Sequence, residues 1–260
     1  MFPIGLLLLF CSLALGQAQP SKIRITTGDW PPYNGQHMPG GGMANALVQA
    51  AFCEVGIEVE FGYFPWSRAL KLAIEGSWQA SSVWAFTPDR AKDLIYSDPL
   101  VAGEDVFYYL EGTDFDWQVI EDLHGWKMGG TIGYSYPGLR SDKGDFQVYL
   151  ERAPSDLLNF RKLLAGRIQV FIADRWVGAY ILNHQFSDAE RKRIVRHPKA
   201  ISTIEYYLVF SKKHKSATSL VQAFNRGLAS LKAHQDPAEF VQLIESATQK
   251  RPEQGTQDKQ

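Results

Sequence analysis

Cysteine and unbalanced charge are both scarce in this sequence of 260 residues. It contains 2 cysteines, Cys11 and Cys53, and 27 Lys and Arg residues stand against 28 Asp and Glu residues, a formal net charge of -1. If an N-terminal leader with Cys11 is removed, Cys53 remains alone, so no intramolecular disulfide is expected. Cys53 lies in an apolar helical stretch and is expected to be a small buried residue. The balanced charge excludes a broad basic surface for nucleic acid or an anionic membrane.

Long apolar runs, nucleotide fingerprints and metal-ligand spacings are missing as well. The apolar start, residues 1–15, is too short to span a bilayer and has the shape of a signal peptide, although it lacks Lys and Arg. The small residues Gly16 and Ala18 predict cleavage after Ala18, with cleavage after Gly16 as the second choice. No Gly-x-Gly-x-x-Gly or Gly-Lys-Ser/Thr motif and no Cys/His cluster occurs, so no nucleotide, metal or other cofactor is expected.

The chain that follows alternates strands and helices. Residues 23–26 alternate like a strand, apolar residues recur at helical spacing over 43–53, and residues 57–61 and 80–86 read as further strands. This order predicts a mostly parallel sheet flanked by helices. In such sheets ligands collect at the carboxyl ends of the strands, where Trp30 follows the first strand. With 45% hydrophobic and 21% charged residues, the chain can form one large domain or two modest lobes.

Arg90 stands in an unusual place for a cation. Thr87 is a good N-cap and Pro88 suits the first helical position, so Arg90 falls in the first turn of a short helix. A cation there opposes the helix dipole, at a cost of a few tenths to about 1 kcal/mol. The presence of Arg90 there is better explained by an anion that its fork-shaped guanidinium group holds than by helix stability. The alternative is a surface ion pair with Asp89 or Asp93.

The middle of the chain repeats the alternation. Residues 123–133 form a strand that enters a glycine-rich loop, and Ser135 follows this loop. Residues 155–166 form a capped helix, and a buried strand at 168–173 ends at Asp174. Asp174 either caps the next helix or neutralises a bound ammonium group.

Two extended runs, 104–110 and 204–210, bracket this middle segment. They suggest a chain that leaves the first lobe, builds a second lobe and returns. The alternative is that they are two strands of a single sheet.

Residues 87–90, Thr-Pro-Asp-Arg, and residues 95–99, Ile-Tyr-Ser-Asp-Pro, resemble a segment of bacterial extracellular solute-binding proteins of the polar amino acid type, family 3. The likeness extends over most of the mature chain. It implies an α/β fold of the type II periplasmic binding protein class, in which each lobe is a mostly parallel sheet flanked by helices and two crossing strands form the hinge. The expected organisation is a signal peptide at 1–18, lobe I at 19–109 and 205–250, lobe II at 110–204, and a polar tail at 251–260.

The resemblance also implies roles for individual residues. Arg90 matches the arginine that binds the ligand's α-carboxylate, Ser135 a hydroxyl residue that assists it, and Asp174 an acid that binds the α-amino group. Trp30 and Trp66 match aromatic positions that sandwich the rest of the ligand, although Trp66 could simply pack in the core of its lobe. Two positions depart from the family pattern, which often has Gly-x-x-Asp before the central strand of each lobe: Gln79 and Gln169 replace these aspartates, and both positions look structural.

The implied function is a monomeric periplasmic binding protein, not an enzyme, that captures a small zwitterion for an ABC importer with its permease in the inner membrane. An input domain for a membrane signalling protein is one alternative, and a secreted lyase such as a dehydratase is a lesser one. Arg68, if it faces the cleft, repels a ligand cation. Neutral or aromatic zwitterions are therefore expected to bind better than lysine or arginine.

Overall fold

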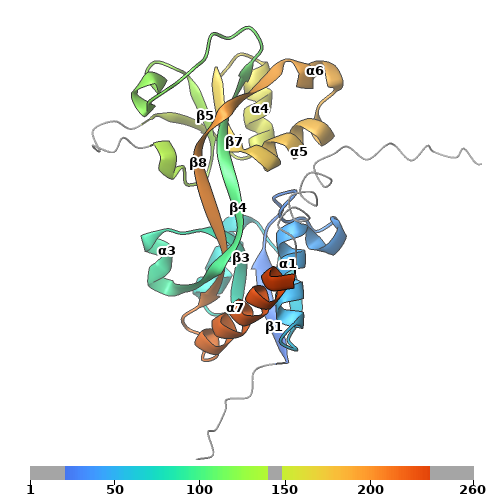
Figure 1. The fold of residues 1–260 in the computed structure, drawn as a ribbon. Helices are drawn as coiled ribbons and strands as arrows, with labels where there is room; N and C mark the ends of the chain where they lie inside the picture. Colours follow the sequence, from blue (N-terminus) through green and yellow to red (C-terminus); the bar gives the residue numbers. More distant parts are fainter. Residues whose placement is uncertain (1–20, 140–147, 235–260) are drawn as a thin grey trace, which may run out of the picture.

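Two long neighbouring strands, β4 (Leu94–Leu110) and β8 (Ile194–Ser211), run through the middle of the molecule and join its two lobes (Figure 1). The computed structural model describes residues 21–139 and 148–234. In it the two strands pair antiparallel at the centre of an eight-stranded sheet of order β2-β1-β3-β8-β4-β7-β5-β6. The two extended runs expected from sequence thus lie in strands that are direct neighbours in one continuous sheet.

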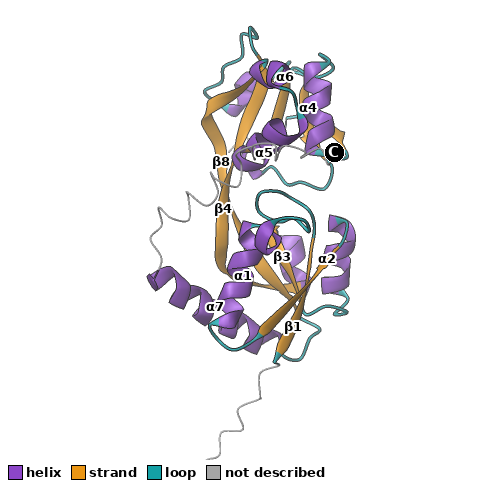
Figure 2. Cartoon of the chain, turned by 90° about the vertical axis from the view of Figure 1, so that its right-hand side faces the viewer, coloured by secondary structure: helices purple, strands orange, loops and turns teal. Residues whose placement is uncertain are grey.

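The remaining elements divide between the two ends of this sheet (Figure 2). The first lobe contains β1 (Lys22–Thr27), η1 (Pro39–Gly41), α1 (Met43–Cys53), β2 (Glu58–Tyr63), α2 (Trp66–Ile74), β3 (Ala80–Ala85), α3 (Pro88–Asp93) and α7 (Ala217–His234). The second lobe contains η2 (Ile120–Leu123), β5 (Met128–Thr131), η3 (Pro137–Leu139), β6 (Leu150–Ala153), α4 (Asp156–Leu164), β7 (Val170–Asp174), α5 (Arg175–Gln185) and α6 (Asp188–Lys192).

The two lobes repeat one arrangement. In the first lobe β1 pairs parallel with β2 and β3, and in the second β5 pairs parallel with β6 and β7. The two glutamines that depart from the family pattern hold equivalent places. The Gln79 side chain accepts a hydrogen bond from the backbone N–H of Arg24 at 3.1 Å, and the Gln169 side chain accepts one from Lys127 at 3.0 Å. Both glutamines are therefore structural.

Local sequence signals are confirmed at the helix starts. The Thr87 hydroxyl accepts a hydrogen bond from Arg90 N at 3.2 Å, with Pro88 in the first turn, and the Ser155 hydroxyl accepts one from Leu158 N at 3.3 Å. Each cap satisfies a backbone donor that the helix leaves unpaired. The expected leader, the helix expected after Pro237 and the polar tail lie outside the described residues.

Cys53 corrects one expectation. It is the last residue of α1 and is exposed, whereas its neighbours Ala51 and Phe52 are fully buried. The apolar run before it suggested burial, but the helix turns its final residue toward solvent. Cys53 is thus not a core residue.

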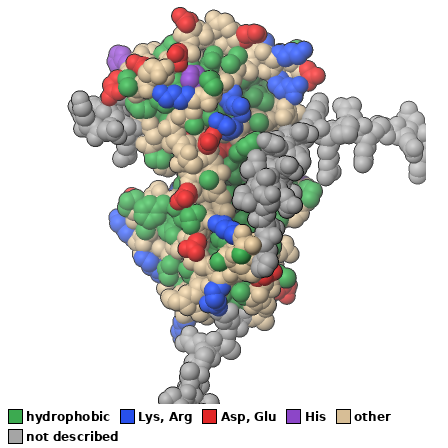
Figure 3. All heavy atoms as spheres, in the orientation of Figure 1, with side chains coloured by type: hydrophobic (Ala, Val, Ile, Leu, Met, Phe, Trp, Pro, Cys, Tyr) green, Lys and Arg blue, Asp and Glu red, His purple; other side chains and the backbone are tan. Residues whose placement is uncertain are grey.

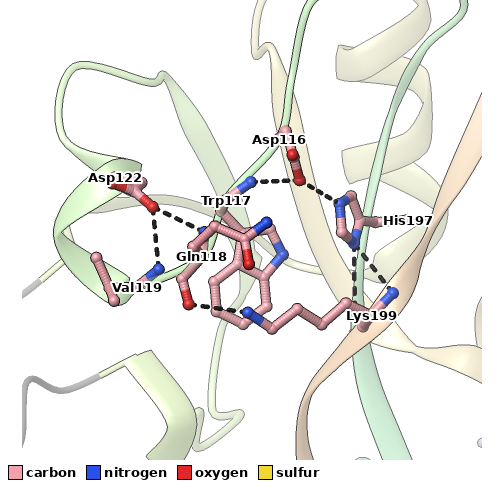
Figure 4. Close-up of polar contacts among 7 residues, drawn as sticks. All are labelled: Asp116, Trp117, Gln118, Val119, Asp122, His197 and Lys199. Atoms are coloured by element: carbon pink, nitrogen blue, oxygen red, sulfur yellow. Dashed lines mark hydrogen bonds and ion pairs between the residues drawn. The ribbon is translucent and has the colours of Figure 1, made fainter.

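The segment after β4 is fastened to β8 at the outer end of the second lobe (Figure 4). Asp116 accepts a hydrogen bond from Trp117 N at 2.7 Å and lies 3.1 Å from His197 Nε2. Lys199 donates to the Gln118 carbonyl at 2.8 Å, and its ammonium lies 4.0 Å from the Trp117 ring centroid. The Trp117 N–H and His197 hold the pKa of Asp116 below its usual range.

The first lobe depends on a close contact between α1 and α7. A Cβ atom on Gly227 of α7 would lie 1.9 Å from the Ala51 carbonyl oxygen of α1. Only glycine lets the two helix backbones approach this closely. The contact covers a core that includes Phe52, Phe210 and Phe224.

Gly227→Ala is expected to push α7 away from α1 and to lower the free energy of unfolding by about 1–3 kcal/mol, the usual cost of overpacking. Urea denaturation of the purified protein measures this. Ala229→Ser, on the exposed side of α7, is the control and should change stability by no more than about 0.5 kcal/mol. Equal stabilities for the two variants would show that the helices separate without cost.

Candidate functional site

Aromatic side chains of the two lobes meet between them. Trp30 and Tyr33, in the loop after β1, stack with ring centroids 4.8 Å apart. Trp30 also makes edge contacts with Tyr206 of β8, at 5.0 Å, and with Tyr134 of the second lobe, at 6.1 Å. These four rings are called the aromatic group below. They form one contact from the first lobe, through a crossing strand, to the second lobe.

Three buried aspartates lie beside the aromatic group and are called the carboxylate cluster. Asp105 of β4 is the direct antiparallel partner of Asp174 at the end of β7. Asp156 begins α4 and accepts hydrogen bonds from the Thr131 hydroxyl and, at 3.3 Å, from the Tyr134 hydroxyl. All three are no more than 5% exposed. Parallel and antiparallel pairing thus bring together acids that are far apart in sequence.

Asp174 links the two lobes. One carboxylate oxygen caps α5 by accepting hydrogen bonds from Trp176 N at 2.9 Å and Val177 N at 3.1 Å. The other accepts a hydrogen bond from the Tyr33 hydroxyl of the first lobe at 3.2 Å. The capping role considered from sequence is confirmed, and it leaves one oxygen facing the other lobe.

Burial dominates the electrostatics of the cluster. It raises the pKa of Asp156 to about 6 and that of Asp174 to about 7, and it raises the pKa of Asp105 well above its usual value. The negative charges of the other cluster members raise the pKa values of Asp105 and Asp174 further. Among the described residues, no Lys, Arg or His forms an ion pair with any of the three.

A cavity of about 920 Å³ opens between the lobes, and of the aromatic group and the carboxylate cluster only Tyr134 lines it. Its first-lobe wall includes Phe86 and residues 87–89, and its second-lobe wall includes residues 133–137 and 148–150 together with Arg152. Figure 3 shows the constriction between the lobes on the face that it presents. Phe86 is 57% exposed, so an apolar ring stands uncovered at the cavity wall.

Arg152 supplies a cation at the second-lobe wall. Its guanidinium donates hydrogen bonds to the carbonyls of Thr131, at 2.7 Å, and Tyr134, at 3.2 Å, and lies 5.6 Å from the Tyr136 ring centroid. These contacts hold the glycine-rich loop against β6.

The residues singled out from sequence do not all reach the cavity. Ser135 lines it, and Arg90 follows directly on the wall residues 87–89. The Arg90 guanidinium is half-buried, donates to the Ala85 carbonyl at 2.9 Å and lies 4.8 Å from the Trp84 ring centroid. Burial lowers the pKa of Arg90. Asp89 pairs with Lys92 instead, so the ion pair considered for Arg90 with Asp89 is not formed.

Trp66 and Arg68 lie apart from the carboxylate cluster. The Trp66 ring packs edge-on against Trp84, with centroids 5.2 Å apart, and closes over Gly28. Arg68 is exposed, and its guanidinium lies 5.3 Å from the Phe64 ring centroid. Neither residue is part of the described cavity wall.

The sequence profile of bacterial extracellular solute-binding proteins, family 3, matches residues 23–243. The chain belongs to this family. No curated protein sequence matches it.

Solved structures share the fold of this solute-binding protein. An amino acid ABC transporter substrate-binding protein from Streptococcus pneumoniae, bound to L-arginine, is 20% identical with a TM-score of 0.65, and the match covers 88% of this chain and 94% of the other. A histidine kinase sensor domain is 18% identical with a TM-score of 0.66 and coverages of 86% and 95%. An ancestral amino acid-binding protein, a precursor of cyclohexadienyl dehydratase, is 18% identical with a TM-score of 0.65 and coverages of 88% and 96%. The periplasmic binding protein-like fold expected from sequence is confirmed.

Two features are absent from the part of this solute-binding protein that the structure describes. None of its described helices is long and apolar enough to cross a membrane. Within residues 21–139 and 148–234, no three His, Cys, Asp or Glu side chains are arranged to hold a metal ion.

Sequence reasoning missed Tyr33 and two of the three acids of the carboxylate cluster in this solute-binding protein. Tyr33 stands in the same turn-rich loop as Trp30 and could have been found there. Asp156 reads as an ordinary acid in the first turn of a helix. Asp105 carries no local signal, because only the pairing of β4 with β7 places it opposite Asp174.

The backbone of β3 is strained where it approaches the site. Val83 has a φ of 64°, in the left-handed region that β-branched residues rarely adopt, and the pairing with β8 shifts register between Ser81 and Trp84. Such conformations cluster at ligand sites and cost of order 1–3 kcal/mol.

Gly103→Ala is expected to disturb the contact between the lobes, because a Cβ atom there would lie 2.1 Å from Asp174 Oδ2 and 3.0 Å from the Tyr33 hydroxyl. We expect a loss of about 1–3 kcal/mol in unfolding free energy. A double-mutant cycle with Asp174→Ser, which keeps a capping oxygen but is shorter, provides the control. The same loss in both backgrounds would show that the approach to Asp174 is not the cause.

The ligand-free protein is expected to melt at a higher temperature at pH 5.5 than at pH 8. The folded-state pKa values of Asp156 and Asp174, about 6 and about 7, lie above the unfolded value of about 3.9. The folded state therefore binds protons more tightly, and its stability falls as pH rises through these values. Thermal melting across this range measures the slope. Combining Asp156→Asn with Asp174→Asn should reduce it to the part that Asp105 contributes, and an unchanged slope would contradict the assignment.

Proposed function

We propose that this solute-binding protein captures a small zwitterionic solute, an amino acid or a derivative, between its two lobes and delivers it to an ABC importer from the periplasm. The observation that carries the proposal is the hydrogen bond of Tyr33 in one lobe to the buried Asp174 of the other. A ligand ammonium group can take the place of this hydroxyl. A ligand that touches both lobes then stabilises their closed arrangement through its differential contacts.

Residues between the two lobes support roles for the two ends of such a ligand. Arg90 forms no ion pair with a described acid, and its guanidinium can hold the α-carboxylate through paired hydrogen bonds with help from Ser135. Asp174 holds the α-amino group. Trp30 contributes a ring face beside it.

Direct ligand contacts of Trp66 and Arg68 have less support than those of the residues named above. The packing of Trp66 on Trp84 supports a place in the wall behind Arg90, because Trp84 carries the Arg90 guanidinium on its ring. The position of Arg68 over Phe64 gives no support for a direct ligand contact. We propose that Trp66 acts through Trp84.

A sensory role is the second candidate, and the shared fold with a histidine kinase sensor domain favours it. Ligand binding is the same physical event in both roles. Genes for a permease and an ATPase beside the gene for this protein would support transport, whereas a gene for a membrane kinase or cyclase would support sensing. The precursor of a dehydratase among the similar structures is itself an amino acid-binding protein, so it favours binding over catalysis.

A thermal-shift screen of residues 19–260 against the amino acids, simple amines and carboxylates tests the proposal. A ligand that binds only the folded state raises the free energy of unfolding by mass action, by about 2.7 kcal/mol at a hundredfold excess over Kd. The melting temperature rises accordingly. Stabilisation by at least one amino acid is the expected result. Stabilisation by carboxylates or amines alone would contradict a zwitterionic ligand.

Arg90→Ala is expected to weaken binding of the best amino acid by about 2 to 5 kcal/mol, the cost of removing one partner of a buried charge pair. Isothermal titration calorimetry measures the change. Lys92→Ala, in the same short helix but on its exposed side, is the control and should bind as the wild type does. Unchanged affinity in Arg90→Ala, with an intact fold, would exclude Arg90 as the carboxylate anchor.

A further inference from the structure

Side chains of the two lobes pack against one another between the lobes. Val177, at the start of α5 in the second lobe, is 1% exposed and belongs to the same buried cluster as Trp30 and Tyr33 of the first lobe. Tyr134 and Trp176 of the second lobe also pack against this cluster. Burial of apolar side chains across an interface favours the association of its two sides. The hydrophobic core of the first lobe thus continues into the second.

A hydrogen bond also crosses this interface. The Tyr33 hydroxyl donates to Asp174 Oδ2 at 3.2 Å, and both residues are no more than 4% exposed. The pair lies over Gly103 of β4, where a Cβ atom would press on both the hydroxyl and the carboxylate. A buried acceptor that loses its donor is costly unless water reaches it. The hydrogen bond therefore opposes separation of the lobes.

Both partners of this hydrogen bond are held in place by their own lobes. The other Asp174 oxygen caps α5, so the cap fixes the direction of the carboxylate. In the first lobe, the Tyr33 carbonyl accepts a hydrogen bond from Ala44 N of α1 at 2.8 Å. The next residue, Asn34, is fully buried and donates to the Thr27 hydroxyl at 2.8 Å. Groups that are already ordered lose little conformational entropy when they meet.

We propose that the Tyr33 hydroxyl and Asp174 form a latch that holds the two lobes together without a ligand, and that Tyr33 competes with the ligand for Asp174. The latch itself does not depend on the ligand, whereas the competition rests on the proposed function, in which Asp174 holds the α-amino group. An ammonium group carries a positive charge and three N–H donors, so it can replace a single hydroxyl donor. The latch lowers the affinity, because only the molecules with an open latch accept ligand.

Distance measurements between spin labels on the two lobes test the latch. Cys53 is exposed on α1 and Ala189 is exposed on α6, so labels on Cys53 and on Ala189→Cys, in a protein that also carries Cys11→Ser, report the separation of the lobes. Without added ligand, we expect Tyr33→Phe to lower the ratio of closed to open molecules at least tenfold. Asp174→Ser, which keeps a capping oxygen but loses the one that faces Tyr33, should do the same.

Tyr207→Phe is the matched control for the distance measurements. Tyr207 lies on β8, and its hydroxyl donates to Glu205 of the same strand at 2.6 Å, so this variant removes a hydrogen bond within one strand. Its distance distribution should equal that of the wild type. The same distribution for the wild type and Tyr33→Phe would overturn the latch, whatever the protein binds.

Calorimetry tests the competition, with the amino acid that gives the largest stabilisation in the thermal-shift screen. Tyr33→Phe should bind it about tenfold more tightly than the wild type does, because the ligand no longer displaces a hydroxyl from Asp174. Tyr207→Phe should bind it as the wild type does. Unchanged or weaker binding by Tyr33→Phe would overturn the competition. Failure of every amino acid to bind would overturn the proposed function and the competition with it, and the distance measurements would still decide the latch.

Discussion

The antiparallel pairing of β4 with β8 is the constraint on which the site depends. The ladder runs from Leu94↔Ser211 to Leu110↔Ile194, so it belongs to both lobes and carries site residues at its middle. Tyr206 of β8 belongs to the aromatic group, and Asp105 of β4 belongs to the carboxylate cluster. The two strands that connect the lobes therefore also supply residues of the site.

The electrostatic character of the site follows from this geometry. Pairing of β4 with β7 forces Asp105 next to Asp174, and the start of α4 brings Asp156 to the same edge. In water three carboxylates would repel weakly, but burial beneath aromatic rings removes the solvent that screens them. The raised pKa values reduce this cost, because the protonated acids carry no charge.

Sequence patterns predicted the elements well and the site only in part. The caps at Thr87 and Ser155, the alternation of strands and helices and the long crossing strands are local signals, and the structure contains them. Contacts between distant strands leave no such signal. Asp105 could be assigned to the site only from the pairing of β4 with β7, and the exposure of Cys53 depended on where α1 ends.

The two structural glutamines mark equivalent points of the two half-sheets. Gln79 and Gln169 each accept a hydrogen bond from a backbone N–H at the start of a neighbouring strand. Between the two half-sheets, the pairing of β4 with β8 shifts register near Tyr96 and Pro99 and again between Asp105 and Tyr108. The regular ladder of the crossing strands is therefore interrupted on both sides of Gly103, the residue that approaches Asp174.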